Sequence, residues 1–122
     1  MIEVLKPMSC IFCKIVEGSI PSRKAYEDEH VVAFHDIQPQ APVHLLVIPK
    51  KHIASLDEAG AEDAELLGRL QLAARQIARD AGLGESGYRV VTNIGRDAGQ
   101  VVFHIHYHVL GGEKLGSLGS KE

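Results

Sequence analysis

The sequence predicts a single α+β domain built on a mainly antiparallel sheet, and three observations lead to that class. Several short segments are rich in branched and aromatic residues and end at glycine, proline or acidic turns, as strands do. One longer segment, residues 61–81, has apolar residues at the spacing of a helix. The strands lie before and after this helix, and 122 residues, 45% of them hydrophobic, suffice for one core.

The first half of the chain predicts one short helix and three strands. The segment "CIFCKIVEG" fits a short helix that ends at Gly18, because glycine readily takes the left-handed conformation of a helix C-cap. "SRKAYEDEHVVAFHD" predicts two strands joined by a polar turn at residues 27–29. After the proline-containing loop "QPQAP", the segment "VHLLVIP" predicts a third strand that ends at Pro49.

The second half predicts the long helix and a final pair of strands. Acidic residues favour the first turn of the helix at residues 61–81, and Gly82 fits its C-cap. "GYRVVTNIG" and "VVFHIHYHVL" predict two strands joined by the glycine-containing turn "GRDAG". We therefore expect five strands with one long and one short helix. The chain divides into a flexible N-terminal arm at 1–9, a domain at 10–112 and a C-terminal tail at 113–122.

Composition and charge argue against several classes of partner. The net charge of −3 and the isoelectric point near 6.1 provide no basic surface for nucleic acid or an anionic membrane. No apolar run approaches the roughly 20 residues of a membrane span, and no basic and apolar leader opens the sequence. We expect a cytoplasmic protein that binds neither nucleic acid nor membrane.

Three of the seven histidines lie in the last predicted strand, in "HIHYH". Alternate residues of a strand share a face, so His104, His106 and His108 are expected on one face. The other face, which the long helix would cover, carries Phe103, Ile105, Tyr107 and Val109. Three imidazoles in register are not a usual core pattern, because each needs hydrogen-bond partners when it is buried.

The spacing of these histidines bears on the choice between a metal site and nucleophilic catalysis. The outer pair of Cα atoms in a regular strand is about 13 Å apart, whereas zinc–nitrogen bonds are about 2.0–2.1 Å long. One ion therefore cannot readily bind all three. Nucleophilic catalysis at phosphorus fits better, with a central imidazole that attacks and neighbours that orient it and handle charge.

The segment from His104 to Leu110 matches the His-φ-His-φ-His-φ-φ signature, with φ an apolar residue, of the histidine triad (HIT) superfamily. "CIFCKIVEGSIPS", "YEDEHVVAFHDIQPQAPVHLLVIPKKHI" and "VVTNIGRDAGQ" also resemble this family, so the resemblance covers Cys10 to Gly112. The ending "VLGG" is similar to the Hint branch, the histidine triad nucleotide-binding proteins. The diadenosine-polyphosphate hydrolase branch usually follows the triad with Pro-Arg.

The resemblance implies a fold, an assembly and an activity. Hint proteins are homodimers whose two sheets join, and they bind purine nucleoside monophosphates. They hydrolyse purine nucleoside phosphoramidates and acyl-nucleotide adducts through a nucleotidyl-histidine intermediate, releasing AMP or GMP, without an organic cofactor. Two alternatives stay open: a nucleotide-binding regulatory module with little turnover, and a zinc hydrolase that uses the triad as ligands. The spacing of the histidines disfavours the latter.

The resemblance also assigns roles to single residues. His106 matches the nucleophile, His108 the residue that contacts the phosphate, and His44 a further active-site histidine that assists proton handling. Asp36 matches the position that binds the ribose hydroxyls. Phosphate contacts are implied for Asn93, Gly99, Gln100 and Val101, the last three through their backbone. The base pocket is implied for Ile11, Phe12, Ile15, Phe34, His35, Ile37 and Leu46.

Cys10 and Cys13 form the only Cys-x-x-Cys in the sequence. This spacing indicates a metal half-site or a redox pair before a structural disulfide. Some bacterial histidine triad proteins with this motif complete a structural zinc site with two histidines, which correspond to His52 and His104 here. Two free thiols and a thioredoxin-like redox pair remain as alternatives.

The sequence departs from many Hint proteins at Val101, where they carry serine in Gly-Gln-Ser. The hydroxyl group near the phosphate is thereby lost, and a hydrogen bond to a charged group contributes about 1.5–3 kcal/mol. We predict slower turnover than in a serine-containing relative. Val101→Ser should raise the rate of phosphoramidate hydrolysis, and an unchanged rate would contradict the prediction.

Overall fold

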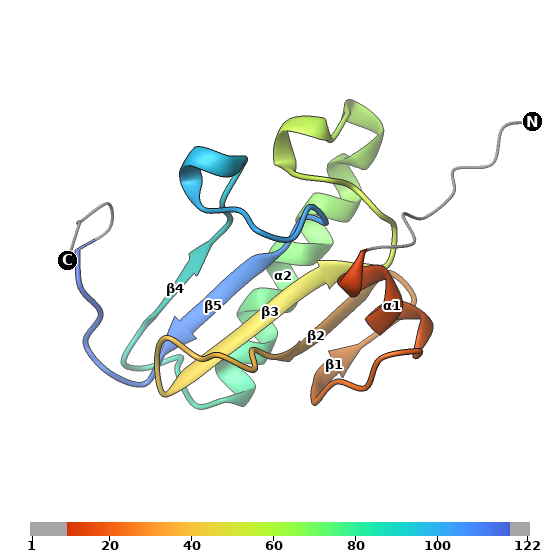
Figure 1. Cartoon of the computed structure of the whole chain (residues 1–122). Helices are drawn as coiled ribbons and strands as arrows, with labels where there is room; N and C mark the ends of the chain where they lie inside the picture. Colours follow the sequence, from red (N-terminus) through yellow and green to blue (C-terminus); the bar gives the residue numbers. More distant parts are fainter. Residues whose placement is uncertain (1–9, 118–122) are drawn as a thin grey trace, which may run out of the picture.

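The structure, a computed structural model, describes residues 10–117 and consists of one antiparallel sheet with a helix on each face (Figure 1). Its strands follow the order β1-β2-β3-β5-β4, and every neighbouring pair is antiparallel. No helix within the described residues is long and apolar enough to cross a membrane. The elements are α1 (Ile11–Glu17), β1 (Lys24–Glu27), β2 (Val31–His35), β3 (Val43–Pro49), α2 (Ala64–Asp80), β4 (Tyr88–Val91) and β5 (Tyr107–Gly111).

The helices begin and end where the sequence predicts. Gly18 takes φ 84° and ends α1, as expected for a glycine C-cap. The long helix starts with a 3₁₀ turn at Ala61–Asp63 before the regular turns of α2, and Gly82 has φ 83° just beyond its end. The predicted class, a five-stranded sheet with one long and one short helix, is confirmed.

The two faces of the sheet pack against different helices. On one face Val31, Ala33, Leu45 and Val47 pack in the cluster that contains the buried residues of α2. On the opposite face Val32, Phe34, Leu46 and Ile48 pack with α1. The alternation of strand side chains thus builds two cores, and β2 and β3, near the middle of the sheet, contribute to both. α1 is short, so the face that carries it retains room for a site.

The last predicted strand is shorter than expected. β5 begins at Tyr107, and residues 101–106 form an irregular connection before it, so only His108 of the three histidines lies in the strand. Ile105, Tyr107 and Val109 still face α2, as predicted. The prediction that α2 covers Phe103 is wrong: its side chain is half exposed, because residue 103 precedes the region with strand alternation.

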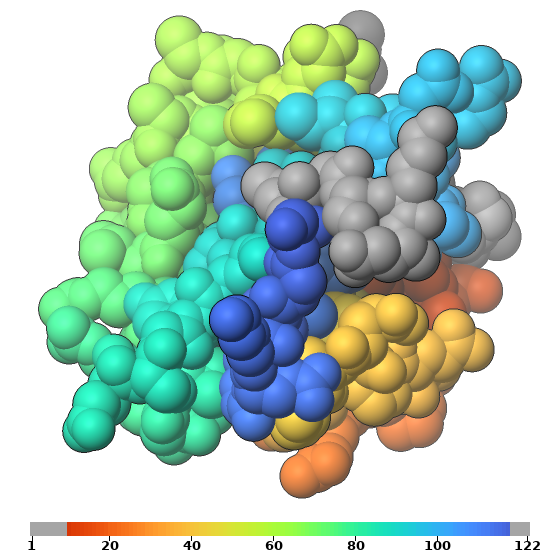
Figure 2. All heavy atoms as spheres, turned by 90° about the vertical axis from the view of Figure 1, so that its left-hand side faces the viewer, coloured from red at the N-terminus to blue at the C-terminus, as the bar shows by residue number. Residues whose placement is uncertain are grey.

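The predicted tail is described as far as residue 117. Arg89 of β4 donates a hydrogen bond from Nη2 to the carbonyl oxygen of Gly116 at 2.7 Å. Figure 2 shows these last described residues, in blue, beside the segment around β4, in teal. The predicted arm at residues 1–9, and the tail beyond residue 117, lie outside the described residues.

The glycine pair that ends β5 is required by close contacts. A Cβ atom on Gly112, which has φ 95°, would lie 2.9 Å from Cβ of Pro42. A Cβ atom on Gly111 would lie 2.7 Å from Cδ1 of Leu83. The "VLGG" ending therefore has a packing reason as well as a conformational one.

We predict that Gly112→Ala lowers the free energy of unfolding by about 2–4 kcal/mol, from left-handed strain and overpacking together. The control is Gly68→Ala in α2, where a Cβ atom meets nothing within 4 Å. This substitution should leave stability unchanged or raise it by up to about 1 kcal/mol. Urea unfolding of both variants provides the measurement, and equal effects would contradict the prediction.

Candidate active site

A cavity of about 670 Å³ opens on the face of the sheet that carries α1. It extends from the segment between α1 and β1 to the connection before β5, so it lies across several strands of this face. The predicted site residues that line it are Ile11, Phe12, Ile15, Phe34, His35, Asp36, Ile37, His44, Leu46, Asn93, Gly99, Val101, His106 and His108. The fold therefore brings together side chains that are far apart in the sequence.

Sequence reasoning missed part of the wall. Residues 20–23, which connect α1 to β1, line the cavity, as do Gln38, Gln40 and Val102. The oxygen Oγ of Ser22 is buried without a hydrogen-bond partner. The sequence predicts a helix that ends at Gly18 and a strand that begins a few residues later. The segment between them must therefore cross the edge of this face, and this could have identified it as part of the cavity wall.

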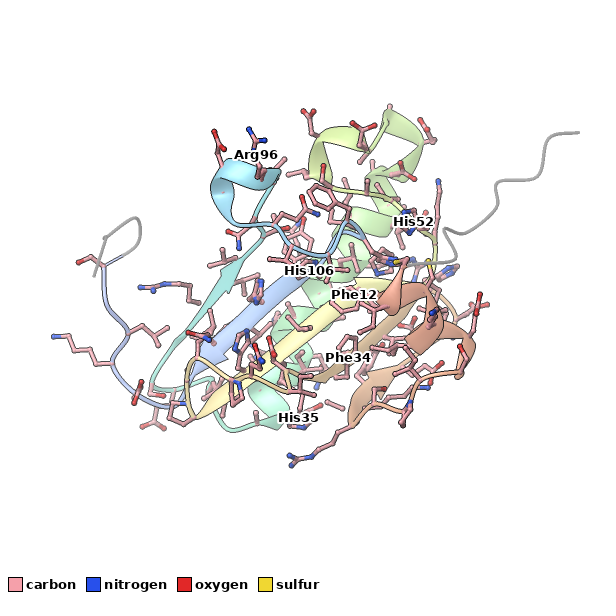
Figure 3. The ribbon with its side chains drawn as sticks, in the orientation of Figure 1. Phe12, Phe34, His35, His52, Arg96 and His106 are labelled. Atoms are coloured by element: carbon pink, nitrogen blue, oxygen red, sulfur yellow. The ribbon has the colours of Figure 1, made fainter. Side chains whose placement is uncertain are left out.

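His106 presents an unprotonated nitrogen to the cavity. Its Nδ1 lies 2.8 Å from the carbonyl oxygen of His104, and a carbonyl oxygen only accepts, so Nδ1 carries the proton. In the neutral ring Nε2 then holds a lone pair. Phe12 contacts the imidazole edge-on, with ring centroids 5.1 Å apart and planes at 89°, and Figure 3 shows the two side chains adjacent. The ring is therefore fixed in orientation and in tautomer.

His44 and His108 form a hydrogen-bonded pair whose tautomers follow from one backbone group. The N–H of Gln40 donates to His44 Nδ1 at 3.0 Å, so the proton of neutral His44 is on Nε2. His44 Nε2 lies 2.8 Å from His108 Nδ1 and donates to it. The proton of neutral His108 is consequently on Nε2, the nitrogen that remains for the cavity. A nucleophilic nitrogen and a hydrogen-bond donor thus stand on neighbouring rings, with centroids 5.1 Å apart.

Burial keeps these imidazoles neutral. Desolvation lowers the pKa of His106, against the opposing effects of the hydrogen bond to the His104 carbonyl and of the Asp36 carboxylate. Desolvation also lowers the pKa of His44, where the Asp36 carboxylate opposes it. It lowers the pKa of His108 to about 4, with further contributions from His106 and His44. Neutral rings are what the two tautomer assignments require near pH 7.

Asp36 follows β2 and is held by its own turn. Its Oδ1 accepts a hydrogen bond from the N–H of Gln38 at 2.8 Å, and its Oδ2 lies 3.4 Å from His44 Nε2. The carboxylate keeps 19% of its side-chain surface exposed and lines the cavity. It can therefore accept hydrogen bonds from a hydroxyl-bearing ligand.

Gln100 supports the cavity wall from behind. Its side chain is buried, with Oε1 accepting from Gly95 N at 2.8 Å and Nε2 donating to the carbonyls of Ala54 at 2.8 Å and Val102 at 3.0 Å. Its side chain does not line the cavity, and the phosphate contact expected of residue 100 is one through the backbone, which stays a prediction. The amide uses its hydrogen-bonding capacity within the protein and ties the loop at residues 95–102 to the segment after β3.

The predicted metal ligands converge in a second cluster at the start of α1, in which Cys10, Cys13 and His104 are buried and His52 is half-buried. His104 Nε2 lies 2.8 Å from the carbonyl oxygen of Pro49 and donates to it, so Nδ1 holds a lone pair. That Nδ1 is 3.5 Å from Sγ of both Cys10 and Cys13 and 3.2 Å from His52 Nδ1. His52 Nδ1 lies 3.2 Å from Cys13 Sγ. All four donor atoms lie within 4.8 Å of one another.

These separations fit one tetrahedral ion. Zinc bonds of about 2.0–2.1 Å to nitrogen and 2.3 Å to sulfur give tetrahedral edges of about 3.3 Å between nitrogens and about 3.5–3.6 Å between nitrogen and sulfur. The observed distances agree within a few tenths of an ångström. The cluster of Cys10, Cys13, His52 and His104 is therefore suited to hold a metal ion.

We predict that Gln100→Glu destabilises the loop that Gln100 supports. A carboxylate would face the carbonyl oxygens of Ala54 and Val102, which accept hydrogen bonds from Nε2 now. The unfolding free energy should fall by about 2–4 kcal/mol, because two buried carbonyls would lose their hydrogen-bond donor and the new carboxylate would be buried without a counter-charge. Thermal unfolding measures the loss, with Gln71→Glu on the exposed face of α2 as the control. Comparable stability of the two variants would refute this role.

The comparisons with known proteins agree with this geometry. The HIT domain matches residues 17–115. An uncharacterized HIT-like protein of Chlamydia muridarum is 49% identical over 111 residues, which are 91% of this chain and 87% of that protein. The structure of a HIT family hydrolase from Clostridium thermocellum has a TM-score of 0.90 and 48% identity, covering 94% of this chain and 100% of that one.

A histidine triad nucleotide-binding protein from Candida albicans has a TM-score of 0.77 and 35% identity, covering 92% of this chain and 87% of that one. The family match extends over most of the chain, and the structural match includes the sheet that carries the histidines. The chain therefore belongs to the HIT domain family.

Proposed function

We propose that the protein is a histidine triad nucleotidyl hydrolase of the Hint branch. It would cleave purine nucleoside phosphoramidates and acyl-nucleotide adducts at the α-phosphate and release AMP or GMP. The observation that carries the proposal is the pair of ring nitrogens at the cavity, the lone pair of His106 Nε2 and the N–H of His108 Nε2. Membership in a family with hydrolase structures supports the class of reaction.

The cavity offers separate surroundings for the three parts of a nucleotide. The phosphate would lie at the two histidines, beside Asn93 and the glycine-bearing loop at Gly99, where backbone N–H groups can approach an anion. Asp36 would accept hydrogen bonds from the ribose hydroxyls. The base would pack among the apolar side chains of Ile11, Phe12, Ile15, Phe34 and Leu46.

The chemistry proceeds in two displacements at phosphorus. In the first, the lone pair of His106 Nε2 forms a bond to phosphorus, the bond to the leaving nitrogen breaks with its electron pair, and that nitrogen takes one proton from solvent. In the second, water attacks phosphorus, the electron pair of the histidine bond returns to Nε2, and one proton returns to solvent. The N–H of His108 Nε2 donates to a phosphate oxygen throughout and stabilises its charge.

A regulatory nucleotide-binding module remains the alternative function, because the cavity alone would serve it. The fixed tautomers favour the enzyme, since a binding module does not require a bare nitrogen directed at the phosphate. We also propose that the protein is a homodimer with a joined sheet and is cytoplasmic, as in the Hint branch.

We propose structural zinc for the cluster of Cys10, Cys13, His52 and His104. Four protein donors would complete a tetrahedron around the ion and leave no open position for water, so the ion would stabilise the fold and take no part in the chemistry. His104 belongs to this cluster with its ring, while its carbonyl oxygen fixes His106. The ion would therefore support the orientation of the nucleophile.

The decisive experiment uses a fluorogenic adenosine phosphoramidate. His106→Ala should lower kcat at least about 10³-fold, because the covalent intermediate can no longer form. His30→Ala is the control, since this exposed histidine lies outside the cavity. Brief exposure to chelator should leave the wild-type rate unchanged. Loss of activity with chelator and not with His106→Ala would indicate a zinc hydrolase, and tight AMP binding without turnover a binding module.

The zinc proposal has its own measurement. Protein purified without chelator should contain close to one zinc per chain, and Cys13→Ala should reduce this content and the unfolding temperature together. A content below about 0.2 zinc per chain would contradict the proposal, by the stoichiometry expected of a structural site. Retention of zinc in Cys13→Ala would show that the metal binds elsewhere.

A further inference from the structure

A second hollow, of about 410 Å³, adjoins the active-site cavity. The two share three apolar residues, Ile11, Val101 and Val102, which form the wall between them. The rest of its lining comes from Cys10, His52, Ala54 and Phe103. The hollow therefore begins where the loop beside the phosphate position ends, and it lies between the start of α1, the segment after β3 and the connection before β5.

Large apolar side chains border this hollow without being covered. Val101 is 85% exposed, Phe103 50% and Ile11 43%. Single exposed apolar residues are ordinary, but three that border one depression next to a reactive site indicate a surface for an apolar ligand group. The size of the hollow suits an aryl or branched alkyl group.

The residues that line the hollow do not favour a charged ligand group. None of the residues that line the hollow is an aspartate, glutamate, lysine or arginine. Cys10 and His52 belong to the metal cluster, where two thiolates would balance the charge of a divalent ion. A charged group placed there would lose solvent without gaining a partner, which is costly.

The hollow adjoins the cavity from which a leaving group would depart. A group displaced in line from phosphorus departs on the side opposite His106 Nε2, away from the buried ring. Val101, which is 85% exposed, lines both the cavity and the hollow. A substituent on the leaving nitrogen or acyl group can pass over Val101 and reach Phe103.

We propose that this hollow is a leaving-group subsite that selects nucleotide adducts of apolar, preferably aromatic, amines and acids over those that carry charge. The proposal rests on the proposed function and adds the chemical class of the departing group. Phe103 is its specificity-determining residue, because it lines the hollow and not the active-site cavity.

The test compares three adenosine 5′-phosphoramidates that differ only at the far end of the amine. The amines are 2-phenylethylamine and its para-carboxylate and para-aminomethyl derivatives, which are similar in size and in basicity at the reacting nitrogen. In the wild type, kcat/KM for the neutral substrate should exceed both charged ones by about tenfold or more, the range of discrimination in apolar pockets. The use of both signs of charge separates desolvation from repulsion by the phosphate.

Variants locate the selectivity. Phe103→Ser should lower kcat/KM for the neutral substrate about tenfold and change the charged ones less than about twofold, and Phe103→Leu should restore most of the loss. Leu72→Ser, an exposed apolar position on α2, should leave all three substrates unchanged. AMP affinity and the melting temperature of each variant verify the fold.

The outcomes separate this inference from the proposed function. If the wild type hydrolyses all three substrates at similar kcat/KM, the subsite is overturned and the hydrolase stands. An equal loss on all three substrates in Phe103→Ser likewise overturns the subsite, because it indicates damage to the active site next to it. If none of the three is hydrolysed, the proposed function fails first. Should Phe103→Ser not fold, the wild-type ratios and Phe103→Leu decide.

Discussion

The hydrogen bond from His106 Nδ1 to the carbonyl oxygen of His104 is the constraint on which the site depends. It fixes the tautomer of His106 and aims its other nitrogen at the cavity. The same residue, His104, directs its ring away from the cavity toward Cys10, Cys13 and His52. Residue 104 thus contacts His106 through its carbonyl oxygen and the metal cluster through its ring, in an irregular part of the chain that precedes the start of β5 at Tyr107.

One face of the sheet carries the larger hydrophobic core, and the other carries the candidate active site. α2 covers one face completely enough to bury a large aliphatic core, and that core anchors Ile105, Tyr107 and Val109. The intervening histidines are thereby forced to the face that the shorter α1 leaves partly open. Burial on that face lowers the pKa of the imidazoles and keeps them neutral. The packing of α2 against one face of the sheet thus determines both the direction and the protonation state of the reactive histidines.

Much of this arrangement could be predicted from sequence, because it depends on local patterns. Alternation placed His106 opposite Ile105 and Tyr107, and the glycines at 18 and 82 marked the helix ends. The limits appeared where long-range contacts decide. The hydrogen bonds that the Gln100 side chain makes to Ala54 and Gly95 carry no local signature, so the sequence did not predict its structural role. The exposure of Phe103 likewise depends on where β5 starts, which cross-strand pairing determines.

The order of roles within the triad shows how geometry adds to a motif. The spacing of the histidines does not reveal which ring nitrogen carries the proton, whereas the tautomer of His108 follows from the Gln40 N–H through His44. The side chain of residue 40 plays no part in that chain of hydrogen bonds. This chain of hydrogen bonds requires only a backbone N–H at position 40, which every amino acid except proline supplies. Proline lacks that N–H and would remove the donor to His44 Nδ1. Only the Asp36 carboxylate, 3.4 Å from His44 Nε2, would then favour the tautomer on which the donor at His108 depends.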